Sequence, residues 1–170
     1  MTSAAAESND LLSLYQDVIL DHGKRPRNAR TVDAATCSAS GNNPLCGDRV
    51  TVTARISSEN QIEDVAALAK GCAISVASAS LMTEVLKGQS VDAARRMFKA
   101  VQDLCTGQRQ PDEAKADVGP ALTAGVDRLA ALSGVQQFPA RVKCATLPWH
   151  VLISCIEGTD RATTETGSNA

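Results

Sequence analysis

The sequence is poor in aromatic residues, with one Trp, one Tyr and two Phe among 170 residues. A buried core must therefore be built mainly from Ala, Val, Leu and Ile. Neither sign of charge dominates, because the formal net charge is −2. That balance gives no electrostatic footprint for nucleic acid or for an anionic membrane surface, and we expect neither partner.

Long apolar runs are absent as well. No segment approaches the roughly 20 apolar residues needed to span a bilayer. The N-terminal segment MTSAAAESNDLLSL lacks the basic region and the continuous apolar region of a secretory signal. We therefore expect a cytoplasmic protein. In that compartment, the six cysteines are more typical of metal ligands, reactive thiols or buried small residues than of disulfide partners.

The length fits a single domain, which we predict to span residues 9–157, with disordered tails at 1–8 and 158–170. Hydrophobic periodicity and turn signals divide this domain into strands and helices. The predicted strands are 34–39, 50–56 and 62–69. The predicted helices are 10–22, 73–88, 90–107, 122–132 and one that starts at 139. The polar segment 107–120 is predicted to be a mobile insertion.

Cys46 and Asp48 lie in the segment PLCGD, where Pro44 and Gly47 favour a tight turn ahead of a strand. A sharp turn can direct both side chains into one site. A thiolate and a carboxylate both bind zinc, at about 2.3 Å and about 2.0–2.2 Å. The alternative is that Cys46 is a small buried residue and Asp48 caps the turn. The spacing alone leaves both interpretations open.

Cys72 and Cys144 are the other candidate thiols. Cys72 precedes the helix predicted from residue 73, and the N–H groups and dipole at a helix N-terminus favour a thiolate. It can equally be a buried residue at a strand end. Cys144 follows Arg141 by one helical turn, and taken alone it is simply a core cysteine. There is no C-x-x-C pair, so a site that joins these thiols exists only in the folded domain.

The remaining cysteines and histidines are weaker candidates. Cys155 would lie roughly 16 Å along a helix from Cys144, too far for the two thiols to share one metal ion. Cys105 is expected in the core. Cys37 either returns to the rim of the site or is an inert strand residue. His150 is expected at the surface, facing away from Cys144, and His22 is left open.

Four segments of the chain resemble the U-type iron–sulfur assembly proteins, the family of SufU, IscU and the N-terminal part of NifU. They are LYQDVILDHGKRPRN, NPLCGD, KGCAIS and FPARVKCATLPW. The resemblance runs from about Leu11 to Ile156. It implies an α+β fold in which helices pack on a three-stranded antiparallel sheet. It also implies a Zn²⁺ site formed by Cys46, Asp48, Cys72 and Cys144.

Details near the third cysteine favour the SufU-like branch. The IscU-like scaffold branch has a histidine directly before that cysteine and a Leu-Pro-Pro-Val-Lys chaperone motif. This chain has Lys143 and Pro-Ala-Arg-Val-Lys instead. Arg141 is typical of SufU-like proteins, which are zinc-dependent sulfur acceptors for a SufS-type cysteine desulfurase. One departure is Pro148, which predicts a kink or two short helices around Cys144.

The resemblance therefore implies a sulfurtransferase. Cys46 would accept persulfide sulfur from the desulfurase, stimulating it, and pass the sulfur to a downstream acceptor or iron–sulfur scaffold. A histidine of the partner would replace one zinc ligand, and Arg141 would hold Asp48 or the displaced thiolate. Two alternatives stay open. One is a scaffold that holds a transient cluster, against which the missing histidine argues; the other is a purely structural zinc module.

Overall fold

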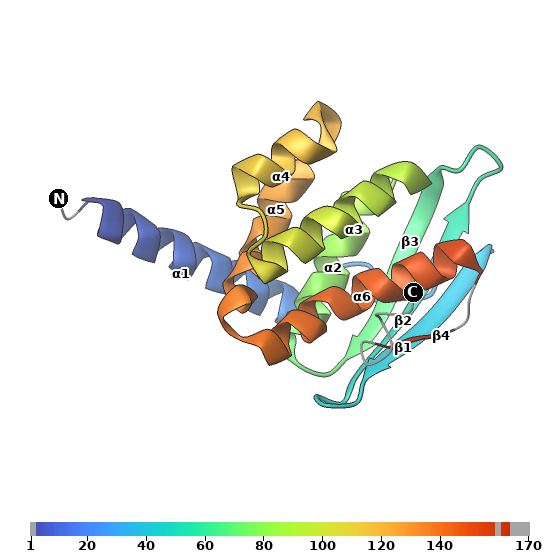
Figure 1. Ribbon diagram of the computed structural model, residues 1–170. Helices are drawn as coiled ribbons and strands as arrows, with labels where there is room; N and C mark the ends of the chain where they lie inside the picture. Colours follow the sequence, from blue (N-terminus) through green and yellow to red (C-terminus); the bar gives the residue numbers. More distant parts are fainter. Residues whose placement is uncertain (1–2, 159–160, 164–170) are drawn as a thin grey trace.

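The computed structural model describes residues 3–158 and 161–163, with side chains over residues 13–158. Helices gather on one face of a twisted sheet (Figure 1). The strands are β1 (Cys37–Asn43), β2 (Asp48–Ile56), β3 (Ile62–Lys70) and β4 (Arg161–Thr163). The helices are α1 (Ser3–Lys24), α2 (Ala73–Leu86), α3 (Val91–Thr106), α4 (Pro111–Val118), α5 (Thr123–Leu129) and α6 (Pro139–Glu157). Short 3₁₀ segments cover Pro120–Leu122 and Ala130–Gln137.

The predicted three-stranded antiparallel sheet is confirmed, because β1 pairs with β2 and β2 with β3, both antiparallel. The cause is the alternation along β2: Val50, Val52 and Ala54 are buried towards the helices, while Arg49 and Thr51 lie on the opposite face. The short β4 adds a fourth strand, parallel to β1. Within the described range, none of the helices is long and apolar enough to cross a membrane.

Several boundaries differ from the prediction. The strand expected at 34–39 is β1 at Cys37–Asn43, because the polar run Gly41-Asn42-Asn43 continues the ladder with β2 instead of turning. The segment 107–120, expected as a mobile insertion, contains α4. Pro111 occupies its first turn, where a missing N–H costs nothing, and Glu113 accepts a hydrogen bond from the N–H of Gln110.

The predicted tails are partly described. Residues 3–8 form the first turns of α1, and Arg161–Thr163 form β4. The rest of these tails, at 1–2, 159–160 and 164–170, lies outside the described residues. Proline at position 148 does not divide α6 into two helices, since the helix is continuous from Pro139 to Glu157. Near the proline, the Ser78 hydroxyl of α2 donates to the carbonyl of Ala145 at 2.5 Å and accepts from Trp149 Nε1 at 3.2 Å.

A disulfide joins Cys37 of β1 to Cys155 of α6, with their Cα atoms 5.4 Å apart. The expectation that the cysteines are not disulfide partners is therefore wrong for this pair. Cys37 is neither of the two things expected of it, an inert strand residue or a residue at the rim of the predicted metal site. The reason is tertiary: α6 packs along β1 and β2, which brings two positions 118 residues apart into register. The free cysteines are Cys46, Cys72, Cys105 and Cys144.

We expect loss of the disulfide to lower the free energy of unfolding by about 2–5 kcal/mol, because the bond closes a long loop in the unfolded chain. The measurement is urea unfolding of the metal-loaded protein with and without a phosphine reductant. The Cys37→Ser variant is the control, because its unfolding midpoint should not respond to the reductant. Equal midpoints for oxidised and reduced wild-type protein contradict this expectation.

Candidate metal centre

The candidate centre lies where three segments meet at one end of the sheet. The turn 44–47 between β1 and β2 contains Cys46, and Asp48 begins β2. Cys72 is the N-cap of α2, directly after β3, and its sulfur accepts from the N–H of Ser75. Cys144 comes from the first half of α6. The antiparallel register places the start of β2 beside the end of β3, so the turn and the helix N-terminus are neighbours.

The side chains converge as a ligand set requires. The sulfurs of Cys46 and Cys144 are 3.5 Å apart, and Cys72 Sγ is 3.7 Å from Asp48 Oδ2. One ligand atom each from Cys46, Asp48 and Cys144 lies within 4.8 Å of the others. Tetrahedral ligands at zinc–sulfur distances are separated by about 3.8 Å. Cys46, Asp48 and Cys144 thus form a group that could hold a small cation. Cys72 is not part of that group, and its sulfur meets it at Asp48.

The burial of Asp48 and Cys144 favours a bound cation, because a buried carboxylate needs a positive partner. Asp48 and Cys144 are fully buried, whereas Cys46 and Cys72 are partly exposed. Asp48 Oδ1 accepts the backbone N–H of Cys72 at 2.8 Å. Burial raises the pKa of the Cys144 thiol, and hydrogen bonds with Asp48, Cys46 and Cys72 raise it further. A divalent cation reverses this tendency, because a coordinating thiol is deprotonated.

Arg141 lies against the thiols, one helical turn before Cys144. The pKa of its guanidinium is raised, first by a side-chain hydrogen bond with Cys144 and then by the charges of Cys72, Cys144 and Cys46. A cation that is always protonated thus stands beside the sulfurs. The groups that raise this pKa are the thiols; whether Arg141 holds Asp48 or a displaced thiolate stays a prediction.

Asn43, the last residue of β1, belongs to the site and was missed by the sequence argument. It is fully buried. Its side-chain Nδ2 is 3.8 Å from Cys144 Sγ, and its Oδ1 accepts the N–H of Leu45 at 3.2 Å. Its carbonyl accepts from the N–H groups of Cys46 and Gly47. The available signal was an Asn at the start of a turn, where its side chain commonly bonds the backbone two residues on.

Gly71 lets Asp48 approach the site. A Cβ at this position would lie 2.0 Å from Asp48 Oδ1 and 2.8 Å from Asp48 Cα. The φ angle of +136° is also one that side-chain-bearing residues rarely adopt. Glycine is therefore required here for the position of the carboxylate as well as for the backbone.

The other candidates lie elsewhere. Cys105 is a core residue as predicted, and burial raises the pKa of its thiol to about 12. His150 is not the surface residue expected: it is partly buried, its ring packs edge-on against Phe98 at a centroid distance of 5.1 Å, and burial lowers its pKa. Neither residue belongs to the candidate metal group found among the described residues.

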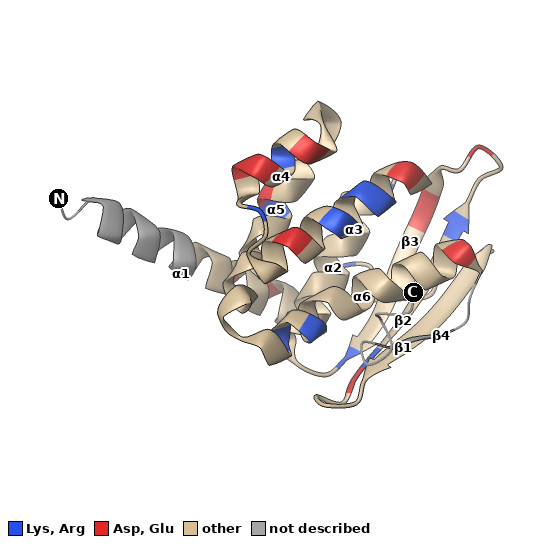
Figure 2. Cartoon of the chain, in the orientation of Figure 1, with Lys and Arg blue, Asp and Glu red and all other residues tan. Residues whose placement is uncertain are grey.

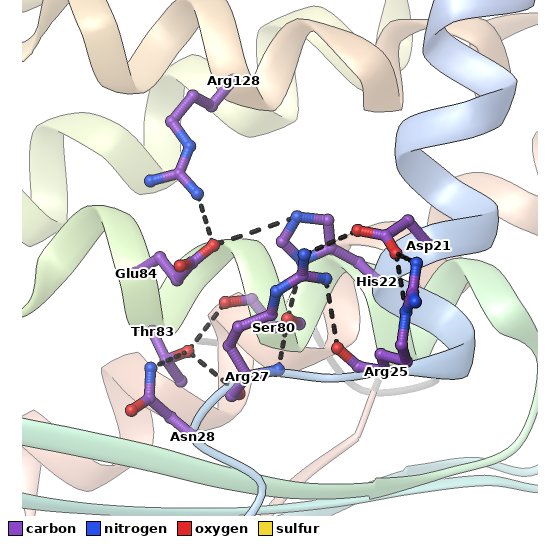
Figure 3. Close-up of polar contacts among 9 residues, drawn as sticks. All are labelled: Asp21, His22, Arg25, Arg27, Asn28, Ser80, Thr83, Glu84 and Arg128. Atoms are coloured by element: carbon purple, nitrogen blue, oxygen red, sulfur yellow. Dashed lines mark hydrogen bonds and ion pairs between the residues drawn. The ribbon is translucent and has the colours of Figure 1, made fainter.

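His22 anchors the loop that follows α1 (Figure 3). Its Nδ1 lies 2.7 Å from Ser80 Oγ, which also accepts the N–H of Arg27. Burial is the main cause that lowers the pKa of His22. Arg27 also binds Asp21 through Nη2 at 2.6 Å. The histidine therefore serves the packing of α1 on α2, and its ring is committed to Ser80.

Comparison with known proteins agrees with this geometry. Residues 14–145 match the family described as "NifU-like N terminal domain". The "Zinc-dependent sulfurtransferase SufU" of Bacillus subtilis is 39% identical over 143 residues, covering 84% of this chain and 89% of that protein. The "Iron-sulfur cluster assembly scaffold protein IscU" of Streptococcus pyogenes is 35% identical over 156 residues, covering 92% and 91%.

A solved structure of an iron–sulfur cluster assembly scaffold protein for the SUF system, from Fervidobacterium islandicum, has a TM-score of 0.66 and 29% identity. The match covers 82% of this chain and 93% of the solved chain. Helices packed on an antiparallel sheet, with cysteines and an aspartate gathered at one end, define the U-type assembly domain. This chain belongs to the NifU-like N-terminal domain family. The resemblance seen in the sequence and the predicted α+β fold are both confirmed.

We expect Gly71→Ala to weaken zinc binding at least tenfold, because the new methyl group displaces the Asp48 carboxylate. Competition with a chromophoric zinc chelator measures the loss. Gly88→Ala is the matched control. Its φ of +85° is also positive, but nothing lies within 4 Å of the added Cβ, so it tests a left-handed backbone without the clash. Equal zinc affinities for the two variants contradict the role given to Gly71.

We expect Asn43→Ala to weaken zinc binding by about 10–100-fold, the usual cost of losing a side chain that orients metal ligands. It should also destabilise the fold by about 1–3 kcal/mol, because a turn N–H and a buried sulfur lose their partner. Asn42→Ala is the control, because the side chain of Asn42 is exposed and contacts neither the turn N–H nor the buried sulfur. Chelator competition and urea unfolding measure the two effects; equal behaviour of both variants contradicts them.

Proposed function

We propose that this chain is a zinc-dependent sulfurtransferase that accepts persulfide sulfur from a SufS-type cysteine desulfurase for iron–sulfur cluster biogenesis. The observation that carries the proposal is the unequal exposure of neighbouring thiols. Cys46 is partly exposed in a turn whose neighbouring Leu45 is 68% exposed, while Cys144, 3.5 Å away, is buried. Cys72 is also partly exposed, but its sulfur caps α2 by accepting the N–H of Ser75, whereas Cys46 lies in an exposed turn that another protein can reach.

We assign Cys46, Asp48, Cys72 and Cys144 as the zinc ligands. When bound, zinc keeps the thiols deprotonated at neutral pH without changing its own redox state. The donor separations and the buried carboxylate support this assignment. The named relative from Bacillus subtilis, described as zinc-dependent, supports it from outside the structure.

The reaction is a thiol–persulfide exchange at Cys46. Its thiolate attacks the terminal sulfur of the desulfurase persulfide, forming a new S–S bond while the old one breaks. The desulfurase cysteine leaves as a thiolate, so the exchange has no net oxidation. The product is a persulfide on Cys46, which a downstream thiol or iron–sulfur scaffold receives by the same exchange. Removing the sulfur in this way stimulates desulfurase turnover.

Arg141 supports the exchange by its charge. The pKa of its guanidinium is raised by Cys144 first and then by the charges of Cys72 and Cys46, which indicates that it lies near all three thiols. A thiolate released from the cluster therefore remains next to a permanent cation, which stabilises it through charge-assisted hydrogen bonds. The neighbouring Asp48 is held by the N–H of Cys72 instead.

A cluster scaffold is the second candidate, and the relative named IscU supports it at similar coverage. The residue before Cys144 is Lys143, which supplies no ligand of the kind a histidine offers. Metal analysis separates the two functions. A sulfurtransferase contains one zinc per chain after purification, whereas a scaffold reconstituted with iron and sulfide retains both through gel filtration.

We expect Cys46→Ala to abolish stimulation of the desulfurase and to remove the added sulfur atom that mass spectrometry detects on the zinc-loaded wild-type protein after incubation with desulfurase and cysteine. Cys105→Ala is the control, because that thiol is buried away from the cluster. Full stimulation by Cys46→Ala, or sulfur that is found on a different cysteine in the wild type, contradicts the assignment of Cys46.

A further inference from the structure

Two basic residues flank the candidate centre on the face of the sheet opposite the helices. Arg49 follows Asp48, and Lys70 precedes the Gly71-Cys72 pair. They are direct partners in the β2–β3 ladder, and both are exposed. Among the described residues, neither side chain has an ion pair or hydrogen bond. Like charges directly opposite on neighbouring strands destabilise a sheet, so this pair does not serve the isolated fold.

The contrast with the other end of the same strand is direct. Arg55 lies on the same face of β2 and meets a carboxylate across the strands, with its Nε 3.4 Å from Glu63 Oε1. Arg30 and Lys87 likewise pair with Asp64 of β3. Basic side chains at that end are thus neutralised within the chain, whereas those beside the metal centre face each other.

A hollow of about 250 Å³ adjoins the two cations. Arg27, which is paired with Asp21, also lines the hollow, and Leu68, 47% exposed, provides an apolar side chain. Thr51 and Ser80 add hydroxyl groups. A hollow with cationic walls and an apolar component suits acidic side chains that carry methylene groups, such as Asp and Glu of a protein segment.

Basic residues also surround the site beyond the hollow, so a larger surface at this end of the molecule suits an acidic partner. Figure 2 shows Lys and Arg at the start of α6 and where β2 begins and β3 ends. Figure 2 shows acidic residues on α3, α4, β3 and the turn between β2 and β3, and Asp21 of α1 is paired with Arg25 and Arg27. The acidic residue at the centre itself, Asp48, is buried. A partner approaching Cys46 therefore meets a positive surface.

We propose that Arg49 and Lys70, with the adjoining hollow, form a docking surface for an acidic segment of the sulfur donor beside its persulfide-bearing cysteine. This inference rests on the proposed function and names the chemistry of the partner surface. Complementary charge steers two proteins together and fixes their register. Since Arg49 directly follows Asp48 and Lys70 lies two residues before Cys72, docking here places the donor sulfur close to Cys46.

The test uses the zinc-loaded protein and the cysteine desulfurase encoded by the same genome. The Arg49→Glu/Lys70→Glu variant should bind the desulfurase at least tenfold more weakly, mainly through a slower association rate, and its binding should depend less on salt than that of the wild type. The desulfurase concentration that half-saturates sulfur loading of the variant should rise in parallel. Zinc content and circular dichroism confirm that the variant is folded.

The matched control is Arg95→Glu/Lys99→Glu on α3, which changes the net charge by the same amount away from the sheet. Its affinity should stay within twofold of the wild type. Wild-type affinity in the Arg49→Glu/Lys70→Glu variant overturns the docking surface alone, as does an equal loss in the control. A wild-type protein that neither binds the desulfurase nor accepts its sulfur overturns the proposed function, and the docking surface with it.

Discussion

The structure depends on bringing a carboxylate and several thiols together where little water reaches them. Asp48 and Cys144 are fully buried, and buried charge is costly unless it is paired or bound to a metal. The N–H of Cys72 and the guanidinium of Arg141 compensate part of that charge. A divalent cation bound at the site would compensate the rest. Gly71 and Asn43 are required by the same cluster. The missing side chain of Gly71 leaves room for Asp48, and the buried amide of Asn43 contacts Cys144.

The frame that holds the cluster is the contact of α6 with β1 and β2. The same helix that contains Cys144 is joined at its far end to β1 by the Cys37–Cys155 disulfide, and Ser78 bonds its backbone beside Pro148. The opposite end of β1 leads through Asn43 into the turn with Cys46. A shift of α6 along the sheet therefore changes the distance between Cys46 and Cys144. Rigidity of the frame and exposure of one turn together give a site in which Cys46 is reachable while Cys144 beside it is buried.

Local signals in the sequence predict much of this fold. The predicted ranges 50–56 and 90–107 lie close to β2 and α3, because the alternation in β2 and the Ser90 cap and Gly107 terminus of α3 are signals confined to neighbouring residues. The polar end of β1 was missed because its pairing with β2, not its composition, makes it a strand. The disulfide depends on the packing of α6 against β1, which no local pattern contains. Among the ligands, spacing identified residue types only; their grouping came from the family resemblance, and Asn43 became visible only in three dimensions.

The central claim is that three sulfurs and one carboxylate oxygen surround a single zinc ion. X-ray absorption spectroscopy at the zinc edge of the metal-loaded protein tests it most directly, because the signal reports ligand type and distance at the metal itself. The account predicts three sulfur neighbours at about 2.3 Å and one oxygen at about 2.0–2.2 Å. A shell of nitrogen and oxygen neighbours alone, or one with fewer than three sulfurs, contradicts it.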